Sequence, residues 1–203
     1  MRQGDLTQGP VMKTMLRFAV PMILGNLLQQ CYNVADTLIV GRFLGAGALA
    51  AVGSSYTLMT FLTSILLGLC MGSSVYFSIQ FGRRAPDRLR NGIFQAFLLI
   101  GFLSLLLTGL VYWALDPILG LLQIPSEIVA LTRTYLLWVF GGILATFFYN
   151  FFANLLRAVG DSASPLAFLG VSVGLNIGLD LLFVIPLSMG IQGAAMATVI
   201  AQY

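Results

Sequence analysis

Five long apolar runs, separated by short polar segments, follow one another along this chain. Each has at least about 20 residues, and as a helix each is long enough to cross the roughly 30 Å of bilayer hydrocarbon. Barrel strands would be shorter and would alternate in polarity, so helices are favoured. The pattern predicts a six-helix transmembrane bundle in an all-α integral membrane protein. The expected spans are 15–41, 52–81, 92–115, 128–156, 165–186 and one that begins near 193 and is incomplete at Tyr203.

Composition supports the same class and narrows the chemistry. The chain is 59% hydrophobic and only 8% charged, whereas soluble domains carry about 25% charged residues. It has no histidine, which removes the usual proton shuttle and the commonest metal ligand. Cys31 and Cys70 both lie within apolar runs, where cysteine behaves as a small core residue. We therefore expect no transition-metal site and no enzymatic Cys/His or Ser/His pair.

The basic residues predict the orientation of the chain in the membrane. Positively charged loops stay on the cytoplasmic side, so the expected topology has a cytoplasmic N-terminus and a multi-pass path through the cell membrane. The basic loop 81–91 is interpreted as a topology signal that contacts anionic lipid, with no nucleic-acid partner. Eight basic residues fall on the expected inner side: Arg2, Lys13, Arg17, Arg83, Arg84, Arg88, Arg90 and Arg157. Only Arg42 and Arg133 fall on the other.

Two aspartates stand out because they lie inside apolar runs. Asp36 lies in the first run and Asp180 in the fifth. A carboxylate near mid-bilayer costs about 2.5–3.5 kcal/mol on insertion scales, so such residues usually face a partner, an ion or a watery cavity. No lysine or arginine lies at the expected depth of Asp180. The function is therefore expected near these two side chains, with an ion or a proton as the partner.

The aspartates belong to organised polar rows. In the first run the polar residues recur every three or four positions and share one helical stripe that is expected to face a cavity. Pro21 precedes this stripe and permits a bend because it removes one backbone hydrogen bond. Helix 128–156 adds Asn150 and Asn154, one turn apart. The members of the first stripe are Asn26, Gln29, Asn33, Asp36 and Thr37.

The fifth run carries two rows of different character. Glycines at every fourth position predict a face that a second helix can approach closely. The polar row is displaced from them by two positions, about 200° around the helix, and is expected to lie opposite. The glycine row is Gly170, Gly174 and Gly178, and the polar row is Ser172, Asn176 and Asp180.

Several strings resemble the multidrug and toxic compound extrusion (MATE) transporters. They are VADTLIVGRFLGAGALAAVG after the first stripe, LLRAVGDSASPL near 155–166, NIGLDLLFV around Asp180 and MGIQGAAMATVIAQ near the end. Their order and spacing, more than any one string, carry the resemblance. It extends over essentially the whole chain, and it implies the amino-terminal lobe of a twelve-helix fold.

The resemblance implies a function and a set of site residues. The family exports amphipathic, often cationic compounds in exchange for protons or sodium ions and needs no other cofactor. A cation pocket is implied inside this lobe, possible for Na⁺ because carboxylates, amides and hydroxyls offer oxygen ligands. Pro21 matches a helix-bending proline of related members. The matching pocket positions are Asp36, Asn154, Asn176, Asp180 and Thr198.

A mechanism follows from these expectations. Two nearby carboxylates repel each other, so the pair should take up a proton or Na⁺ readily. Neutralisation is then expected to let the first helix repack or bend at Pro21 and to favour release of the exported compound. Transport by repeat-built transporters moves one lobe against another. The expected partners are therefore the bilayer, small amphipathic substrates, and a carboxy-terminal lobe or a second copy of the chain.

Three alternatives remain open from the sequence. A lipid-linked oligosaccharide or polysaccharide flippase of the same superfamily would share the fold but should line its cavity with cationic residues. An intramembrane aspartyl protease would also use two membrane aspartates, but its Tyr-Asp and Gly-x-Gly-Asp motifs are not matched at Asp36 and Asp180. A channel or scaffold subunit would not require ion exchange.

Overall fold

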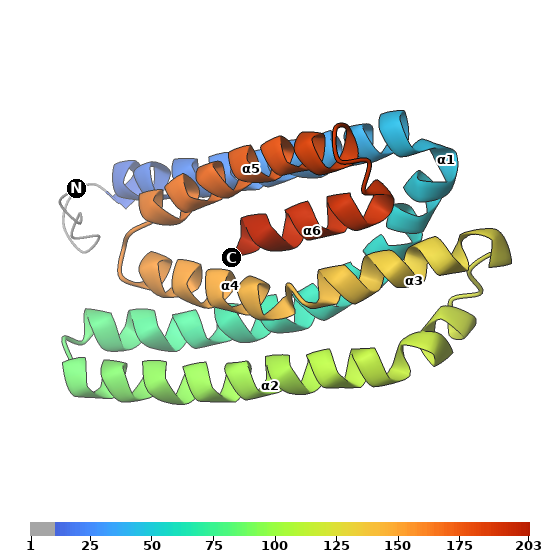
Figure 1. Ribbon diagram of the computed structural model, residues 1–203. Helices are drawn as coiled ribbons and strands as arrows, with labels where there is room; N and C mark the ends of the chain where they lie inside the picture. Colours follow the sequence, from blue (N-terminus) through green and yellow to red (C-terminus); the bar gives the residue numbers. More distant parts are fainter. Residues whose placement is uncertain (1–10) are drawn as a thin grey trace.

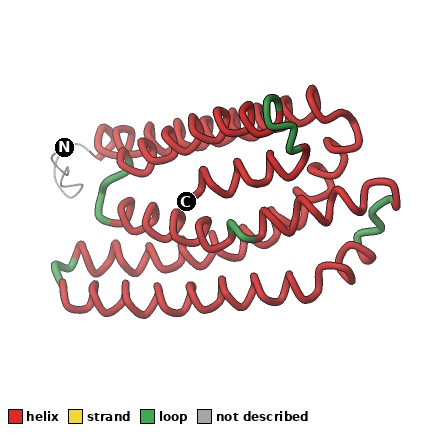
Figure 2. Tube along the Cα trace, in the orientation of Figure 1, coloured by secondary structure: helices red, strands yellow, loops and turns green. Residues whose placement is uncertain are grey.

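The structure, a computed structural model, describes residues 11–203 as a bundle of six helices joined by short loops, with no strand among these residues (Figures 1 and 2). The all-α prediction is confirmed. The helices are α1 (Val11–Gly82), α2 (Pro86–Leu121), α3 (Ser126–Phe140), α4 (Ile143–Ala158), α5 (Ala163–Val184) and α6 (Gly190–Gln202).

Helix α1 contains two of the expected spans because the chain reverses direction within it (Figure 1). Gly45 is the one non-helical residue inside α1, with φ 84° and ψ −177°. This conformation is essentially reserved for glycine, since a Cβ would clash with the backbone. We call residues 11–44 the first limb and residues 46–82 the second limb.

The span expected at 128–156 is interrupted, which differs from the prediction of one continuous helix. α3 ends at Phe140, α4 begins at Ile143, and the two helices are bent by 45°. The amides of Gly141 and Gly142 turn back to the carbonyls of Trp138 and Val139, as in a tightened last turn. Two consecutive glycines let the backbone bend where a residue with a larger side chain would resist.

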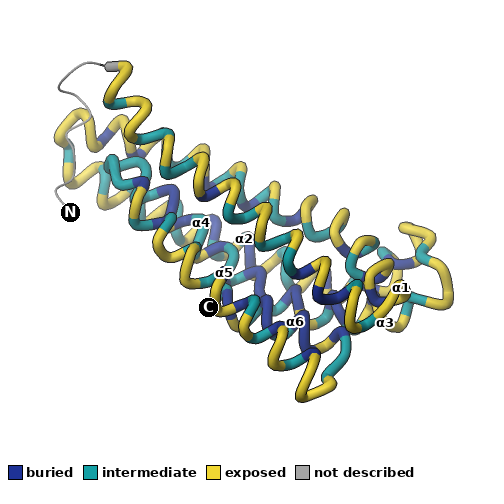
Figure 3. The backbone as a smooth tube through the Cα atoms, turned by 90° about the horizontal axis from the view of Figure 1, so that it is seen from above, coloured by how far each residue is buried: buried dark blue, intermediate teal, exposed yellow. Residues whose placement is uncertain are grey.

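The core of the bundle surrounds α6, which lies between α5 and the α3–α4 pair (Figures 1 and 3). Small residues allow this close approach, because Ala194, Ala195 and Ala197 are fully buried. A second cluster, rich in phenylalanine, fills the space between the second limb, α2, α3 and α4. Its buried aromatic residues include Phe77, Phe140, Phe147 and Phe151.

The outer surface is apolar, as expected for a protein surrounded by lipid. By length and composition, α1, α2 and α5 can each cross a membrane, and the bent α3–α4 pair can form one more crossing. Outward side chains such as Trp113, Phe102 and Val171 are strongly exposed. α1 has 72 residues and reverses at Gly45, so its two limbs each exceed the about 20 residues that one crossing needs.

Charge separates the two ends of the bundle. The start of α1, the α1–α2 turn and the α4–α5 turn lie at one end, which we call the basic end (Figure 1). Of the residues described there, Lys13, Arg17 and Arg157 join the four arginines of the α1–α2 region. Arg2, also counted in the topology prediction, lies outside the described residues.

Candidate functional site

The two aspartates that stood out in the sequence meet inside the bundle. The first limb and α5 run side by side, with Leu28 against Gly170. Both carboxyl groups are buried: Asp36 is 9% exposed and Asp180 is 0% exposed. The two carboxyl groups are near enough to interact electrostatically. Spans separated by more than 100 residues thus build one acidic centre.

Hydroxyl groups from two further helices border this centre. The Tyr32 hydroxyl, one turn before Asp36, donates to Thr198 Oγ1 on α6 at 3.5 Å. Thr198 in turn donates to the Ala194 carbonyl of its own helix. Tyr135 on α3 is buried, and its hydroxyl interacts electrostatically with both carboxyl groups. The first limb, α3, α5 and α6 therefore all contribute.

Several polar atoms of the centre have no partner among residues 11–203. They are one carboxylate oxygen of Asp36, both carboxylate oxygens of Asp180, and the amide nitrogen and oxygen of Asn176, one turn before Asp180. Polar atoms buried at such depth normally have a hydrogen-bond partner, because leaving one unpaired costs about 1–3 kcal/mol. Five of them in one place indicate a site built to receive something polar.

Asn154, which the resemblance placed in the same pocket, lies elsewhere. Ser172 on α5 and Thr146 on α4 are at one depth, because both contact the last turn of α6. Because α4 runs toward the basic end and α5 runs away from it, Asp180 lies eight residues beyond Ser172 away from that end (Figure 1). Asn154 lies eight residues beyond Thr146 toward that end. At 1.5 Å per residue the two side chains are separated by roughly 20 Å along the bundle. The structure thus groups four of the five predicted ligands and sets Asn154 apart.

The predicted cavity-lining stripe of the first limb divides between two surroundings. Asp36 points inward, whereas Asn33 and Thr37 line a cavity of about 280 Å³ that opens on the outside of the lobe, together with Gln30 and Tyr56. Of the remaining predicted lining residues, Gln29 is half-buried and Asn26 is exposed. The stripe therefore follows the border between the interior and an outer groove.

The two rows of α5 differ only in part from the prediction: the polar row faces the interior as expected, whereas most of the glycine row does not pack. The polar row packs, since Ser172 donates to the Ala201 carbonyl of α6 at 2.5 Å and Asn176 and Asp180 are buried. A Cβ at Gly174 or Gly178 would meet nothing within 4 Å, so no helix of the described chain approaches there. Alanines of α6, rather than the glycines of α5, permit the close approach.

Pro21 lies within the first limb, where the helix continues with helical backbone angles. Because proline has no N–H, the carbonyl one turn earlier lacks its usual partner. The structure thus shows a weakened point without a break at Pro21.

Three neighbours of the site were missed in the sequence. Tyr32 and Gln202 could have been predicted from their spacing. Tyr32 lies one turn from Asp36, and Gln202 lies one turn from Thr198, each pair on one helical face. Tyr135 carries none, since the aromatic residues of its span are expected to be core or lipid-facing.

The donor set suits a proton or a hard cation. Carboxylates, an amide and hydroxyls supply oxygen, the ligand type that hard cations prefer. Among residues 11–203 no three His, Cys, Asp or Glu side chains gather as they would at a transition-metal site.

Comparison with known proteins gives consistent matches. Residues 21–182 match the family model described as MatE. The chain is 37% identical over 202 residues to the "Probable multidrug resistance protein YpnP" of Bacillus subtilis (strain 168), covering all of this chain and 45% of that protein. It is 31% identical over 202 residues to the "Multidrug export protein MepA" of Staphylococcus aureus (strain NCTC 8325 / PS 47), covering 96% of this chain and 43% of that protein.

A solved structure described as "Crystal structure of MATE in the bent conformation" superposes with a TM-score of 0.88 at 28% identity, covering 98% of this chain and 43% of that chain. The chain thus spans less than half the length of the relatives it matches.

Proposed function

The chain belongs to the MatE family, and we propose that it forms the amino-terminal, cation-binding lobe of a secondary active multidrug efflux transporter. In this proposal the complete transporter exports amphipathic, often cationic compounds in exchange for protons or sodium ions. Family membership identifies a transporter rather than an enzyme, so the two aspartates are not assigned to protease chemistry.

The observation that carries the proposal is the acidic centre. Asp36 and Asp180 come from helices far apart in sequence, are buried together, and have carboxylate oxygens without partners among the described residues. Two uncompensated negative charges inside a membrane protein are costly, and a single bound cation or proton offsets much of that cost. Asn176 and Thr198 supply additional oxygens at the same place.

The proposed coupling acts through the first limb, which bears Asp36. A cation shared by Asp36 and Asp180 ties the first limb to α5, and its loss frees the limb to move. Pro21 is the weakened point at which this limb can bend. The relative solved in a bent conformation supports a helical rearrangement of this kind. The cation can shift such an equilibrium only by its difference in affinity for the two states.

The remaining partners follow from the proportions of the chain. We assign the outer groove and the exposed glycine face to the side that meets a carboxy-terminal lobe or a second copy of this chain. The basic end is proposed to be cytoplasmic, by the excess of arginine there.

No observation favours a flippase. Arg133, which lies within the expected span 128–156, forms an exposed ion pair with Asp116 at 2.8 Å and so does not line a cavity for a pyrophosphate group.

The test is competition between an amphipathic cation and the coupling ion. Binding of ethidium to the purified chain is measured by fluorescence anisotropy in sodium chloride and in choline chloride of equal ionic strength, at neutral and mildly acidic pH. Because antiport requires the two ligands to oppose each other, sodium or acid should weaken ethidium binding. The Asp180→Asn variant should lose this effect, whereas Asp87→Asn, at an exposed carboxylate, should retain it. Ethidium binding that changes with neither sodium nor pH in any variant would refute the proposal.

A further inference from the structure

A second polar feature, separate from the acidic centre, follows one face of α4. Thr146, Asn150 and Asn154 recur every fourth residue, and each side chain donates to the carbonyl one turn earlier, at 3.0, 2.8 and 2.8 Å. They form a row about 12 Å long along the helix axis. The adjacent positions Phe147 and Phe151 are buried in the aromatic cluster. The same helix thus has one apolar face and one polar face.

The row is connected to the acidic centre through α6. Thr146 Oγ1 lies 3.3 Å from Gln202 Oε1. Gln202 is one turn from Thr198, whose hydroxyl receives the hydrogen bond of Tyr32 beside Asp36. Polar side chains of the first limb, α6 and α4 therefore lie at intervals between the acidic centre and the middle of α4.

The other end of the row reaches buried polar groups at the basic end. The rings of Phe77 and Phe151 pack with centroids 6.0 Å apart, so Gln80 and Asn154, each three residues further along parallel segments, lie at one depth. Gln80 is 6% exposed, and its Oε1 has no partner among residues 11–203. The Nε of Arg157 is likewise buried and unpaired within that range.

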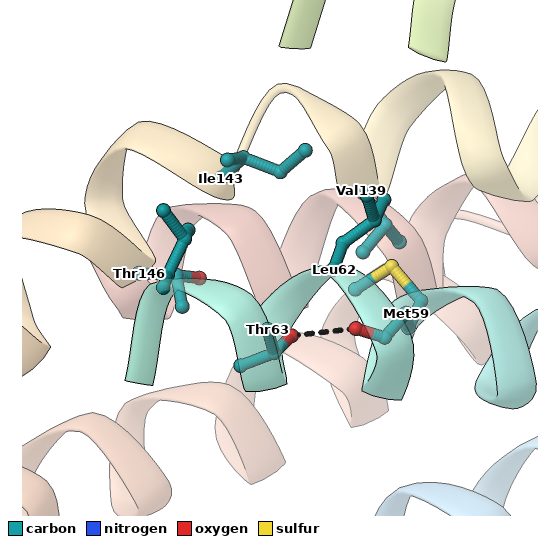
Figure 4. Close-up of a pocket in the computed structure, with 7 residues that line it drawn as sticks. Met59, Leu62, Thr63, Val139, Ile143 and Thr146 are labelled. Carbon is teal, nitrogen blue, oxygen red and sulfur yellow. Dashed lines mark hydrogen bonds between the residues drawn. The ribbon is translucent and has the colours of Figure 1, made fainter. Parts of the chain in front are cut away.

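The narrowest point of this series lies at the break between α3 and α4. A Cβ at Gly142 would be 2.7 Å from Gln202 Oε1, so any larger residue would force the Gln202 amide to move. A cavity of about 10 Å³, close to the space one water needs, borders Thr146 at this break. Its other lining side chains are mainly apolar, and the Thr63 hydroxyl donates a hydrogen bond to the Met59 carbonyl (Figure 4). Irregular backbone inside a membrane protein is tolerated where it is buried in protein or lines a water-filled path.

From this arrangement we propose that the row Thr146–Asn150–Asn154, continued by Gln202 and Gln80, is the path by which protons or small cations pass between the acidic centre and the basic end. The inference rests on the proposed function, since a path is needed only if the centre exchanges ions. It assigns Asn154 to this path, in place of the cation pocket, and Gln202 to its constriction.

Thiol accessibility tests the path directly. In a chain in which Cys31 and Cys70 are replaced by serine and alanine, single cysteines are placed at Thr146, Asn150 and Asn154. The matched controls are Phe147→Cys and Phe151→Cys, which lie within one residue of the same depths on the apolar face. A membrane-impermeant cationic methanethiosulfonate is applied to each side of sealed vesicles. Arg84→Cys and Gln123→Cys, on exposed turns at opposite ends, report which side is labelled.

Asn150→Cys and Asn154→Cys should react at least about tenfold faster than the two phenylalanine controls, because thiol reactivity follows exposure to water. The reagent should reach them from the Arg84 side. Equal rates at row and control positions, or access from the Gln123 side alone, would overturn the path. If Asn154→Cys does not fold, the labelling rate of Asn150→Cys, at a half-buried position, tests the path instead.

The same experiment separates this inference from the proposed function. Labelling does not require ion binding. If the row is not labelled but sodium or protons still compete with ethidium, the proposed path is wrong and the proposed function stands. If the row is labelled but neither sodium nor protons compete with ethidium, the proposed function is wrong and the row only lines a water-filled crevice.

Discussion

At the scale of single residues, a few polar side chains held inside an apolar bundle form the proposed site. Asp36 and Asp180 could be identified from sequence because a charge inside a long apolar run is costly and therefore conspicuous. Their partners were harder to find. Asn154 shows why: its spacing on α4 resembles that of a ligand, but depth along a bundle depends on which residues of different helices meet, and no sequence row contains that information.

Tyr32 is expected to support the acidic centre through its hydroxyl. Tyr32→Phe removes the donor to Thr198 and the nearest hydroxyl to Asp36. A hydrogen bond of this kind contributes about 0.5–1.5 kcal/mol, so sodium should bind a few-fold more weakly. Equilibrium binding of radioactive sodium measures the change. Tyr56→Phe, at an exposed tyrosine in the outer groove, serves as the control and should bind as the wild type does.

Asp161 is expected to stabilise the start of α5. Its carboxylate accepts hydrogen bonds from the amides of Ala163 and Ser164 and from the Ser164 hydroxyl, at 3.1, 3.0 and 2.6 Å. These bonds lower the pKa of Asp161 below its usual 3.8. Asp161→Ala should therefore cost about 1 kcal/mol of unfolding free energy, as loss of a helix cap does.

The pH dependence follows from the direction of this shift. Because the folded pKa is depressed, the stabilisation is complete well above pH 3.8 and disappears as the pH falls through the lower folded value. Thermal unfolding in detergent should show the difference between wild type and Asp161→Ala shrinking in this acidic window. Asp161→Asn keeps a side-chain acceptor and should lose less. A difference that persists unchanged in acid would contradict the role of the carboxylate.

At the scale of elements, the sequence predicted which segments are helical but not where they bend. Helix ends were misplaced by several residues because helices continue beyond the apolar runs that reveal them. The break at Gly141–Gly142 was missed because glycine is common in membrane helices and packs as often as it bends them. The glycine row of α5 was misread for the same reason, since its pattern shows that a close approach is possible and not that it occurs.

The reversal of α1 gives a prediction about one glycine. Gly45 has φ 84° and ψ −177°, and nothing lies within 4 Å of the position a Cβ would take. Gly45→Ala should therefore destabilise the chain by about 1–3 kcal/mol through backbone strain alone. Gly53→Ala, in a helical stretch that also has open space, should be neutral or stabilising by up to about 1 kcal/mol. Unfolding in detergent would distinguish them, and equal effects of both would argue against the assigned turn.

At the scale of the whole molecule, the chain builds one lobe with a buried acidic centre and an open outer groove. It spans less than half the length of its relatives, and the transport proposed above would need a second lobe because repeat-built transporters move one lobe against another. Composition identified the class of protein, and the rows of polar residues predicted the position of the proposed site. In the proposed function, the compound exported and the choice between protons and sodium depend on geometry and on partners that the sequence pattern does not show.

Sodium binding is the decisive property if Asp36 and Asp180 form a cation site within this lobe. Binding of radioactive sodium to the purified, folded chain is measured between about pH 5 and pH 9, beside Asp180→Asn and the exposed control Asp87→Asn. The account predicts saturable binding that weakens as protons compete at low pH, is lost in Asp180→Asn and is unchanged in Asp87→Asn. Sodium binding that is the same in wild type and Asp180→Asn would contradict it.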